Sequence, residues 1–204
     1  MTGCVANDSN DKQANSREPI LPVESERMSV SFVDAPHPAV IPLDELLDEC
    51  ELRTQRRSGP GGQHRNKTSS GVFLTHKPTG VVGEATERRS QAQNREVALE
   101  RLRFRLAVEI RTHSVIDQPA EASELDLRER YYGKSLKLND SNVAKPAVMA
   151  MLLNDLHASG GQPSAVSKIW KVSTSAVIAL VKGNPQAFSF LNQTRAHHGR
   201  RGLK

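Results

Sequence analysis

Hydrophobic and polar side chains alternate along a short stretch in the first half of the chain, and this pattern predicts a β-hairpin. Val72, Leu74 and His76 fall on one face of the first strand, and the return strand opens at Val81. The intervening KPTG has proline at the position that a type I turn favours and glycine at its last position. Residues 51–56, ELRTQR, predict a further strand before the hairpin.

Apolar residues spaced three and four apart predict two helices in the same half of the chain. A short helix is predicted within residues 41–52, with acidic residues in its first turn. A longer helix is predicted from Ser90, because Ser90 and Gln93 have the spacing of a capping box. The apolar stripe of the longer helix consists of Leu99, Leu102, Leu106 and Ile110.

The last third of the chain is rich in apolar residues and predicts four helices. The first covers residues 146–159, and two shorter ones cover 164–170 and 173–183. A final helix starts at Pro185, a residue favoured at the first helical position. Because the turn between the two short helices is tight, we expect a bundle that resembles a helix-turn-helix.

These patterns predict an α+β fold in four parts. Residues 1–38 are polar and lack an apolar period, so we expect a disordered leader. Residues 39–112 form an α+β domain in which a small sheet with packed helices bears a glycine-rich loop. Residues 113–142 are expected to be a linker, partly helical around 125–132. Residues 143–204 form a small all-α module with a short basic tail.

The net charge of +5 hides an uneven distribution along the chain. Residues 1–52 have three Lys and Arg against eleven Asp and Glu, or −8, whereas residues 53–105 have twelve against four, or +8. Residues 106–204 have thirteen against eight, or +5. A basic middle segment is typical of a protein with a polyanionic partner, most often nucleic acid, although a solvated charged surface gives the same count. With one Trp, two Tyr and five Phe, stacking on bases has few aromatic residues available.

Other features exclude several classes of protein. Cys4 and Cys50 form neither a metal-ligand spacing nor a disulfide framework, which favours a reducing, cytoplasmic location. The sequence has neither a membrane-spanning run nor the apolar core of a signal peptide. Met28 precedes the first stretch that looks ordered and is an alternative to Met1 as the translation start.

The tripeptide GGQ occurs twice, at residues 61–63 and 160–162. The second copy follows an apolar helix and precedes Pro163, so helix termination explains it. The first copy lies in RRSGPGGQHRNKTSSGV, residues 56–72, between two predicted strands and inside the basic segment. A flexible glycine turn is the simplest interpretation of this stretch, and a backbone that must enter a narrow space is the functional one.

The chemistry open to the first copy is electrostatic. Gly61 and Gly62 free the backbone to present the Gln63 N–H outward, as a donor for a carbonyl oxygen that gains negative charge. A side-chain amide does not titrate in the useful range, so Gln63 is neither a general base nor an ordinary nucleophile. Any catalysis would therefore consist of positioning and charge stabilisation.

The region resembles the catalytic GGQ (RF-1-type) domain of class I peptide chain release factors. The shared features are Ser58-Gly59-Pro60-Gly61-Gly62-Gln63, Asn66-Lys67, Pro78-Thr79-Gly80, Arg89-Ser90-Gln91 and Asn94. Within that family it is most similar to short ribosome-rescue peptidyl-tRNA hydrolases that lack the codon-recognition domain. The resemblance covers residues 40–112.

The resemblance implies that the loop enters the peptidyl-transferase centre and that the ester of peptidyl-tRNA is hydrolysed there. Gly61, Gly62 and Gln63 would be the catalytic residues, the Gln63 side chain would help to seat a water, and Gln63 would be a candidate for N-methylation. RNA would supply much of the remaining machinery, so neither a metal nor another cofactor is expected. The nucleic-acid contacts would be Arg56, Arg57, Ser58, His64, Arg65, Asn66, Lys67, Arg88 and Arg89. The expected partners are the RNA of the large ribosomal subunit and peptidyl-tRNA, bound by a monomer.

Departures from the full-length release factors and from the rescue hydrolases leave recruitment open. The sequence has no recognisable codon-reading region, which argues against codon-specific termination, yet its basic tail is only RAHHGRRGLK. The helical module is an addition that could contact a protein partner, a whole stalled ribosome or a split large subunit. Two alternatives remain, a non-catalytic RNA- or ribosome-binding factor and a DNA-binding regulator. The second is disfavoured because the helix from Ser173 lacks Arg, Asn and Gln for reading bases.

Overall fold

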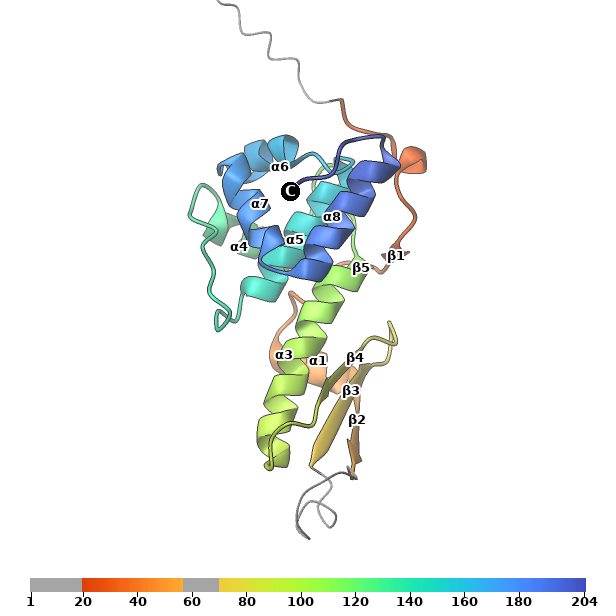
Figure 1. Ribbon diagram of the computed structural model, residues 1–204, viewed down its shortest axis with the longest axis vertical. Coiled ribbons are helices and arrows are strands. Elements are labelled where there is room, and N and C mark those ends of the chain that lie inside the picture. The colour runs from red at the N-terminus through yellow and green to blue at the C-terminus, as the bar shows by residue number, and fades with distance from the viewer. Residues whose placement is uncertain (1–19, 57–69) are drawn as a thin grey trace, which may run out of the picture.

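The computed structural model describes residues 20–56 and 70–204 and has an elongated shape organised around one long helix (Figure 1). This helix, α3 (Gln91–Glu109), runs from a small sheet at one end into a group of helices at the other. The sheet contains β2 (Cys50–Gln55), β3 (Gly71–His76) and β4 (Val82–Ala85). The helical group contains α4 (Ala122–Tyr131), α5 (Lys145–Ala158), α6 (Pro163–Trp170), α7 (Thr174–Lys182) and α8 (Pro185–His197). The predicted α+β fold is confirmed.

The sheet is antiparallel in the order β2-β3-β4, and it packs on α3 through one face. Val72 and Leu74 are buried against that helix, as the alternation of residues 72–76 predicted. A Cβ atom at Gly83 would lie 2.2 Å from the Ala98 carbonyl oxygen, so only glycine lets β4 approach α3 this closely. The predicted hairpin and the strand before it are both confirmed.

Strand β2 forms an open edge of this sheet. Among the described residues it pairs with β3 alone, and its side chains from Glu51 to Gln55 are exposed. Leu52 lies opposite Leu74 in the register yet keeps 46% of its surface accessible, because α3 covers β3 and β4 rather than β2. The short helix α1 (Leu43–Asp48) comes directly before β2 and packs at the strand's N-terminal end, where its Leu46 is buried.

Helix α3 contributes to two hydrophobic cores. Its N-terminal end is capped as predicted, with the Ser90 hydroxyl accepting a hydrogen bond from the Gln93 N–H. Leu102 and Leu106 pack into the core under the sheet, whereas Ala107 belongs to the core of the helical group. The buried Arg103 side chain donates to two backbone carbonyls, those of Ala39 and Val143. Helix α3 ends before the predicted boundary at 112, yet it packs against residues on both sides of that boundary.

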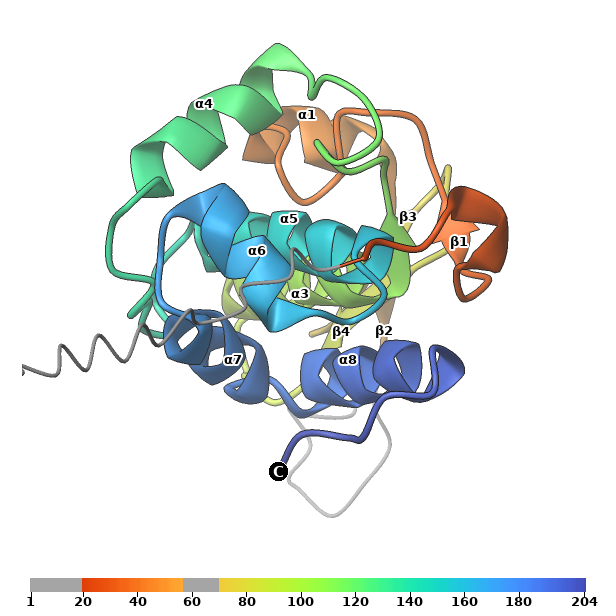
Figure 2. The ribbon, with the colours of Figure 1, turned by 90° about the horizontal axis from the view of Figure 1, so that it is seen from above.

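Helix α5 lies in the middle of the helical group, with α4 on one side and α7 and α8 on the other (Figure 2). Every residue of α5 is buried, which explains why its sequence is apolar on all sides. The predicted helices of this region are all present, and the Ser173 hydroxyl caps α7 by accepting from the Ala176 N–H. Among the described residues no single helix is long and apolar enough to cross a membrane. Within the same residues, only the bent pair of α6 and α7, taken together, has the length and apolar composition of a membrane span.

A buried carboxylate joins four segments of the helical group. Asp155 on α5 is fully buried and accepts two hydrogen bonds from the Arg128 guanidinium, at 2.7 and 2.9 Å. It also accepts from the Trp170 indole N–H at 2.7 Å and from the Ser114 hydroxyl at 2.6 Å. Because a buried charge is costly unless fully paired, these bonds fix α4, α5 and α6 in one arrangement.

The expected disorder of residues 20–38 is wrong for this part of the leader; residues 1–19 lie outside the described ranges. Strand β1 (Ser31–Phe32) pairs in parallel with β5 (Ile110–Arg111), after a short 3-10 helix, η1 (Glu24–Glu26). Arg27 forms a two-bond ion pair with Asp117, at 2.7 and 2.8 Å. These contacts lie some 90 residues apart in sequence, so no local pattern indicates them. A chain starting at Met28 would lack the Arg27 ion pair.

The linker expected at residues 113–142 is also corrected. Its partly helical stretch is confirmed as α4, but the segment is part of the helical core rather than a tether. Leu127 and Leu136 are 7% and 3% exposed. Glu124 is buried as well, and its carboxylate accepts from the backbone N–H of His37 at 2.9 Å. Most polar side chains of this segment are exposed, whereas Ser114, Glu124 and Arg128 are buried and hydrogen-bonded inside the fold.

Candidate functional site

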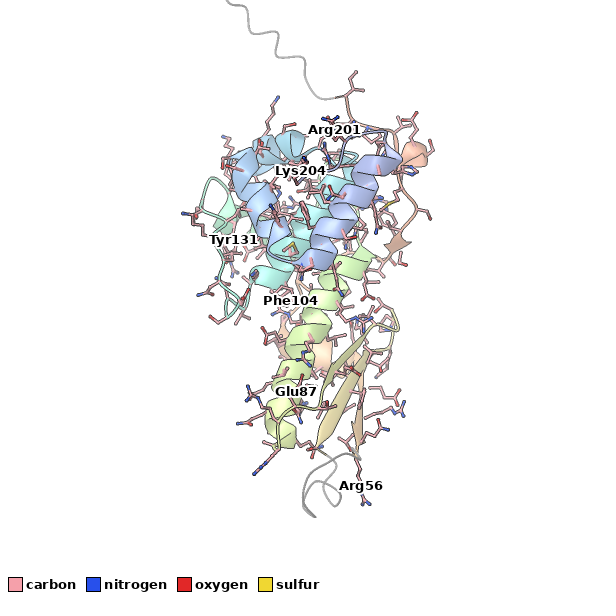
Figure 3. All side chains as sticks on the ribbon, viewed as in Figure 1. Arg56, Glu87, Phe104, Tyr131, Arg201 and Lys204 are labelled. Atoms are coloured by element: carbon pink, nitrogen blue, oxygen red, sulfur yellow. The ribbon has the colours of Figure 1, made fainter. Side chains whose placement is uncertain are left out.

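Most of the site residues predicted from the sequence fall outside the described ranges. They lie within residues 57–69 and comprise Arg57, Ser58, Gly61, Gly62, Gln63, His64, Arg65, Asn66 and Lys67. The described members are Arg56, Arg88 and Arg89, and all three are exposed at the sheet end of the molecule. Figure 3 shows Arg56 beyond the end of β2, directed away from the body of the protein. The roles of all these residues stay predictions.

The base of the glycine-rich stretch is a narrow strand pair. The chain leaves β2 at Gln55 and enters β3 at Gly71, and these two residues are partners in the register. A Cβ atom at Gly71 would lie 3.0 Å from the Gln55 carbonyl oxygen and 3.2 Å from the Thr86 methyl group. The two ends of the intervening segment are therefore held side by side at the end of the elongated molecule (Figure 1).

The Asn94 side chain fastens this base to the start of α3. Asn94 is fully buried, and its Nδ2 donates to the carbonyls of Ser70 and Arg88 at 2.6 and 2.9 Å. Its Oδ1 accepts from the Arg88 N–H at 2.9 Å. One amide thus fixes both the segment that enters β3 and the turn before α3. Sequence reasoning assigned Asn94 no role of its own, although a buried amide on the inner face of an amphipathic helix is a usable signal.

The arginines at this end divide into two groups. Arg101 and Arg105 on α3 form hydrogen bonds within the fold, to the backbone carbonyls of Glu84 and Val82 respectively. A hydrogen bond from Arg101 also lowers the pKa of the exposed Glu87 carboxyl to about 2. The second group is exposed and forms no ion pair with a carboxylate of the described residues; it consists of Arg53, Arg56, Arg88, Arg89 and Arg95. These side chains supply a positive surface around the base of the loop.

His76 is a structural residue in the described fold. It is buried, with Nδ1 at 2.7 Å from the Thr79 hydroxyl and Nε2 at 2.9 Å from a Glu49 carboxylate oxygen. These bonds tie the hairpin turn to the start of β2, away from the end that bears the glycine-rich stretch. Among the described residues, no group of three or more His, Cys, Asp or Glu side chains is arranged to hold a metal ion.

The second GGQ is accounted for by helix termination, as its sequence context indicated. Gly160 and Gly161 have φ angles of 65° and 72°, and the Gly161 N–H donates to the Leu156 carbonyl at the end of α5. Gln162 donates from its side chain to the carbonyls of Ser159 and Ile20. Its amide is thus committed to holding the end of α5 and the N-terminal segment.

The basic tail packs back onto the helical group. Arg195 and Arg200 donate to the carbonyls of Gly161 and Gly160, at 2.7 and 2.6 Å. Leu203 is held through its backbone by the Asn192 side chain. Arg201 and Lys204 remain exposed at the end of the molecule opposite Arg56 (Figure 3). Two of the tail's arginines are therefore used within the fold.

Helices α6 and α7 are bent by 109° at the turn between them, an angle typical of a helix-turn-helix. The inner face of α7, with Val177, Leu180 and Val181, is buried in the helical core. Its exposed positions carry small residues such as Ser175 and Ala179, and its Lys182 donates to the carbonyl of Lys204. The described contacts of this helix therefore give no support to reading DNA bases.

Comparison with known proteins places these residues in context. The sequence model of the RF-1 domain matches residues 43–141. A protein of Rattus norvegicus named peptide chain release factor 1-like, mitochondrial, is 40% identical over 84 residues, 41% of this chain and 22% of the relative. Peptide chain release factor 2 of Variovorax paradoxus (strain S110) is 42% identical over 100 residues, 48% of this chain and 27% of the relative. Peptide chain release factor 2 of Thermomicrobium roseum is 50% identical over 74 residues, 33% of this chain and 20% of the relative.

The chain spans about a quarter of the length of these curated relatives. The family match takes in the sheet, α3 and α4, and it ends before α5 begins. It therefore includes residues 113–141, in agreement with their packing into the fold. Helices α5–α8 lie beyond it.

Proposed function

Residues 43–141 form an RF-1 domain of the kind found in peptide chain release factors, and we propose that this chain hydrolyses the ester of peptidyl-tRNA on the ribosome. The observation that carries the proposal is that Gly61-Gly62-Gln63 lies in the sequence between β2 and β3 of this domain, whose paired ends, Gln55 and Gly71, lie at one end of the elongated molecule. Its second GGQ, by contrast, ends a helix within the protein.

The proposed chemistry uses the backbone N–H of Gln63. This donor stabilises the negative charge that develops on the ester carbonyl oxygen during attack by water, an effect worth about 3–4 kcal/mol. The Gln63 side chain seats the water, and Gly61 and Gly62 leave room for the close approach. The Asn94 hydrogen bonds and the Gln55–Gly71 pair support the accurate placement of this donor.

The exposed arginines at the same end support an RNA-lined target. Arg56, Arg88 and Arg89, together with the basic residues of 57–67, would contact ribosomal RNA or tRNA phosphates. We further propose, from the resemblance to short ribosome-rescue hydrolases, that release does not depend on a stop codon.

The test is peptide release from purified ribosomes that carry labelled peptidyl-tRNA. Parent protein is added to ribosomes stalled on mRNA truncated within the coding region, to ribosomes with a stop codon in the decoding site, and to separated large subunits. Release from the truncated complex or from large subunits is expected. Release only with the stop codon would refute stop-codon independence while preserving the hydrolase.

Three variants test the catalytic assignment. Gln63→Pro removes the backbone donor and should slow release about 10²- to 10³-fold. Gly62→Ala should have a similar effect by blocking the close approach, whereas Gln63→Ala keeps the N–H and should lose less. Gln162→Ala, in the second GGQ, is the matched control and should release peptide at the parent rate. Inactivity of the parent on all three complexes would favour a non-catalytic RNA-binding factor.

A further inference from the structure

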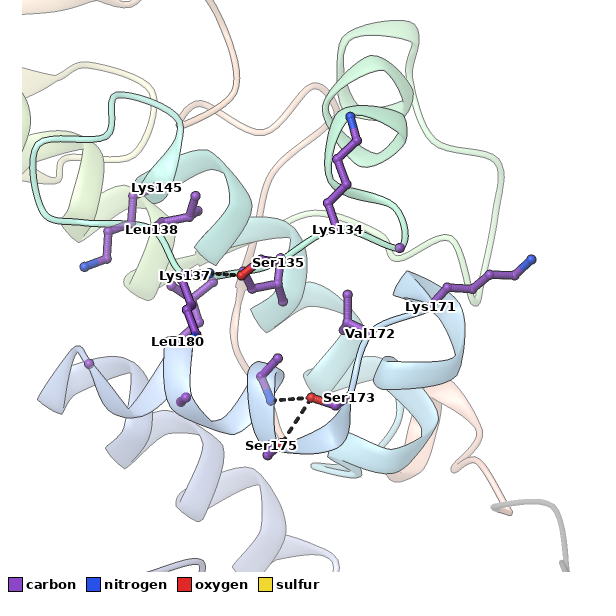
Figure 4. A pocket seen from close by; sticks show the side chains of 15 residues that line it. Lys134, Ser135, Lys137, Leu138, Lys145, Lys171, Val172, Ser173, Ser175 and Leu180 are labelled. Carbon is purple, nitrogen blue, oxygen red and sulfur yellow. Dashed lines mark hydrogen bonds between the residues drawn. The ribbon is translucent and has the colours of Figure 1, made fainter.

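A basic hollow lies in the helical group, between residues 133–138 and helix α7 (Figure 4). Its volume is about 690 Å³. We call it the lysine groove, after Lys134, Lys137, Lys145 and Lys171 in its lining. It lies on the opposite half of the molecule from the open ends of β2 and β3.

Tertiary contacts hold both walls of the lysine groove in place. Residues 133–138 are anchored by Leu136, which is 3% exposed, and by a hydrogen bond from the Gly133 N–H to the Trp170 carbonyl. The other wall is α7 and the turn before it, where Lys171 has a φ of 48° and ends α6. Val172 and Leu180 line the hollow from this side and also pack into the helical core. The groove is therefore a built feature and not a gap between independent parts.

The charge of the lysine groove is of one sign. Its lining contains four lysines and neither Asp nor Glu. Lys145 pairs with Asp140 at 2.5 Å, and the Lys171 ammonium lies 5.1 Å from the centre of the Tyr132 ring. Lys134 and Lys137 are exposed and form no ion pair with a carboxylate of residues 20–56 or 70–204. Asp140 thus balances one of the four lysines, and a hollow with the remaining positive charge attracts an anionic partner.

The side chains between the lysines identify the kind of anion. Ser135, Ser173 and Ser175 place hydroxyl groups along the hollow, between lysines at its two sides (Figure 4). Lysines combined with small hydroxyl side chains are the usual contacts to the phosphates of a nucleic-acid backbone, and they carry no base preference. An acidic peptide would meet the same charge, but α7 offers it few large apolar side chains outside the core.

We infer that the lysine groove binds the phosphate backbone of RNA and gives the protein a second RNA contact, remote from the GGQ loop. The choice of RNA rests on the proposed function, which brings the chain to a ribosome. The groove and the open ends of β2 and β3 lie in opposite halves of the elongated molecule, which α3 connects (Figure 1). Binding at both ends would orient the long axis of the protein on an RNA surface. The helical group is thereby assigned a role that the RF-1 match does not cover.

The experiment measures binding of the full chain to a fluorescent single-stranded RNA of mixed sequence, over a series of salt concentrations. The test variant combines Lys134→Gln, Lys137→Gln and Lys171→Gln, which remove charge and keep the length of the side chains. It should bind about tenfold more weakly than the parent at moderate salt. The slope of log K against log salt should fall by about 2, because about three phosphate contacts are lost.

The matched control combines Lys168→Gln, Arg201→Gln and Lys204→Gln, three exposed cations of the same helical group outside the groove. It loses the same charge and should change the affinity less than about twofold. Equal weakening of both triple variants would show a general charge effect and overturn the inference. Displacement of RNA by a poly-glutamate peptide at equal charge, abolished by the groove substitutions, would also overturn it and identify an acidic protein segment as the occupant.

The same assay separates this inference from the proposed hydrolase. If the parent releases no peptide and the groove variant still loses affinity for RNA, the proposed function fails and the groove assignment stands. If the parent releases peptide and the groove variant binds RNA as the parent does, the groove assignment fails alone.

Discussion

The sheet end and the helical end of this protein differ in whether their charged side chains are exposed to solvent or buried and paired. At the sheet end, β2 is an exposed edge, and Arg56, Arg88 and Arg89 extend into solvent. At the helical end, α5 is buried along its whole length, and the Asp155 carboxylate is completely enclosed by donors from three other segments. Cations that are unpaired on a surface are available to a partner, whereas buried and paired groups hold a fold together.

This contrast indicates that the two ends of the molecule, joined by α3, have different roles, one in activity and one in stability. The sheet end holds Gln55 and Gly71, the residues that flank residues 56–70, as a strand pair, and the helical end supplies most of the buried apolar side chains, including Trp170. A substitution at the helical end should therefore act first on stability, and one at the sheet end first on peptide release. The following predictions test that separation.

The largest effect is expected for Asp155→Ala. Removal of the carboxylate leaves the Arg128 guanidinium buried without its partner, and should lower the free energy of unfolding by about 3–5 kcal/mol. Urea denaturation followed by circular dichroism measures this. Asp126→Ala, which breaks an exposed pair with Arg130 on neighbouring α4, is the control and should cost less than about 0.5 kcal/mol. Equal costs for the two variants would refute the structural role of Asp155.

A smaller loss of stability but a larger loss of activity is expected for Asn94→Ala. The change leaves the Ser70 and Arg88 backbone groups without their partner and should cost about 2 kcal/mol. Peptide release by the folded variant should also slow, because the chain entering β3 is no longer fixed.

Ser90→Ala is the matched comparison for Asn94→Ala, since it removes the cap of the same helix without touching Ser70. It should cost about 1 kcal/mol and leave release unchanged at a temperature where the protein is folded. A parallel decline of release in both variants would mean that α3 stability alone controls the loop.

A further effect concerns pH and the junction between the two ends, where His37 is buried. Its Nδ1 accepts from the Ala39 N–H and its Nε2 bonds to the Ile110 carbonyl. Burial, helped by the charge of Arg111, lowers the pKa of His37 to about 3. Below pH 6.5 His37 therefore binds a proton in the unfolded chain but stays neutral in the folded chain. The free energy of unfolding should fall as the pH falls from 6.5 towards 3. The loss is at most about 1.4 kcal/mol per pH unit.

Unfolding measured from pH 7 to pH 5 for the parent and for His37→Gln tests this assignment. The variant should show a flatter dependence. Burial also lowers the pKa of His157, which adds to the slope, and raises the pKa of the Glu124 carboxyl, which opposes it. Both remain in the variant, so the difference between the two curves isolates His37. Identical slopes would contradict the assignment.

Much of the fold could be predicted from local signals. The caps at Ser90 and Ser173, the alternation that buries Val72 and Leu74, and the stop at Gly160-Gly161 act through residues within a few positions of each other. The candidate catalytic tripeptide was likewise separated from its copy at 160–162 by its neighbours in sequence. Asn94 was visible in the sequence, but its role was not, because its partner Ser70 lies 24 residues away.

The sequence by itself determined the order of β2, β3, β4 and the helices from α3 onward, and the RF-1 resemblance, because each depends on contiguous residues. Only the tertiary structure decided that residues 20–38 pack onto the helices and that 113–142 belong to the core. The same holds for the four segments that meet at Asp155 and for the lysines that line one groove. These features depend on contacts between residues that are distant along the chain, and such contacts form only when the whole chain buries its apolar surface in one arrangement.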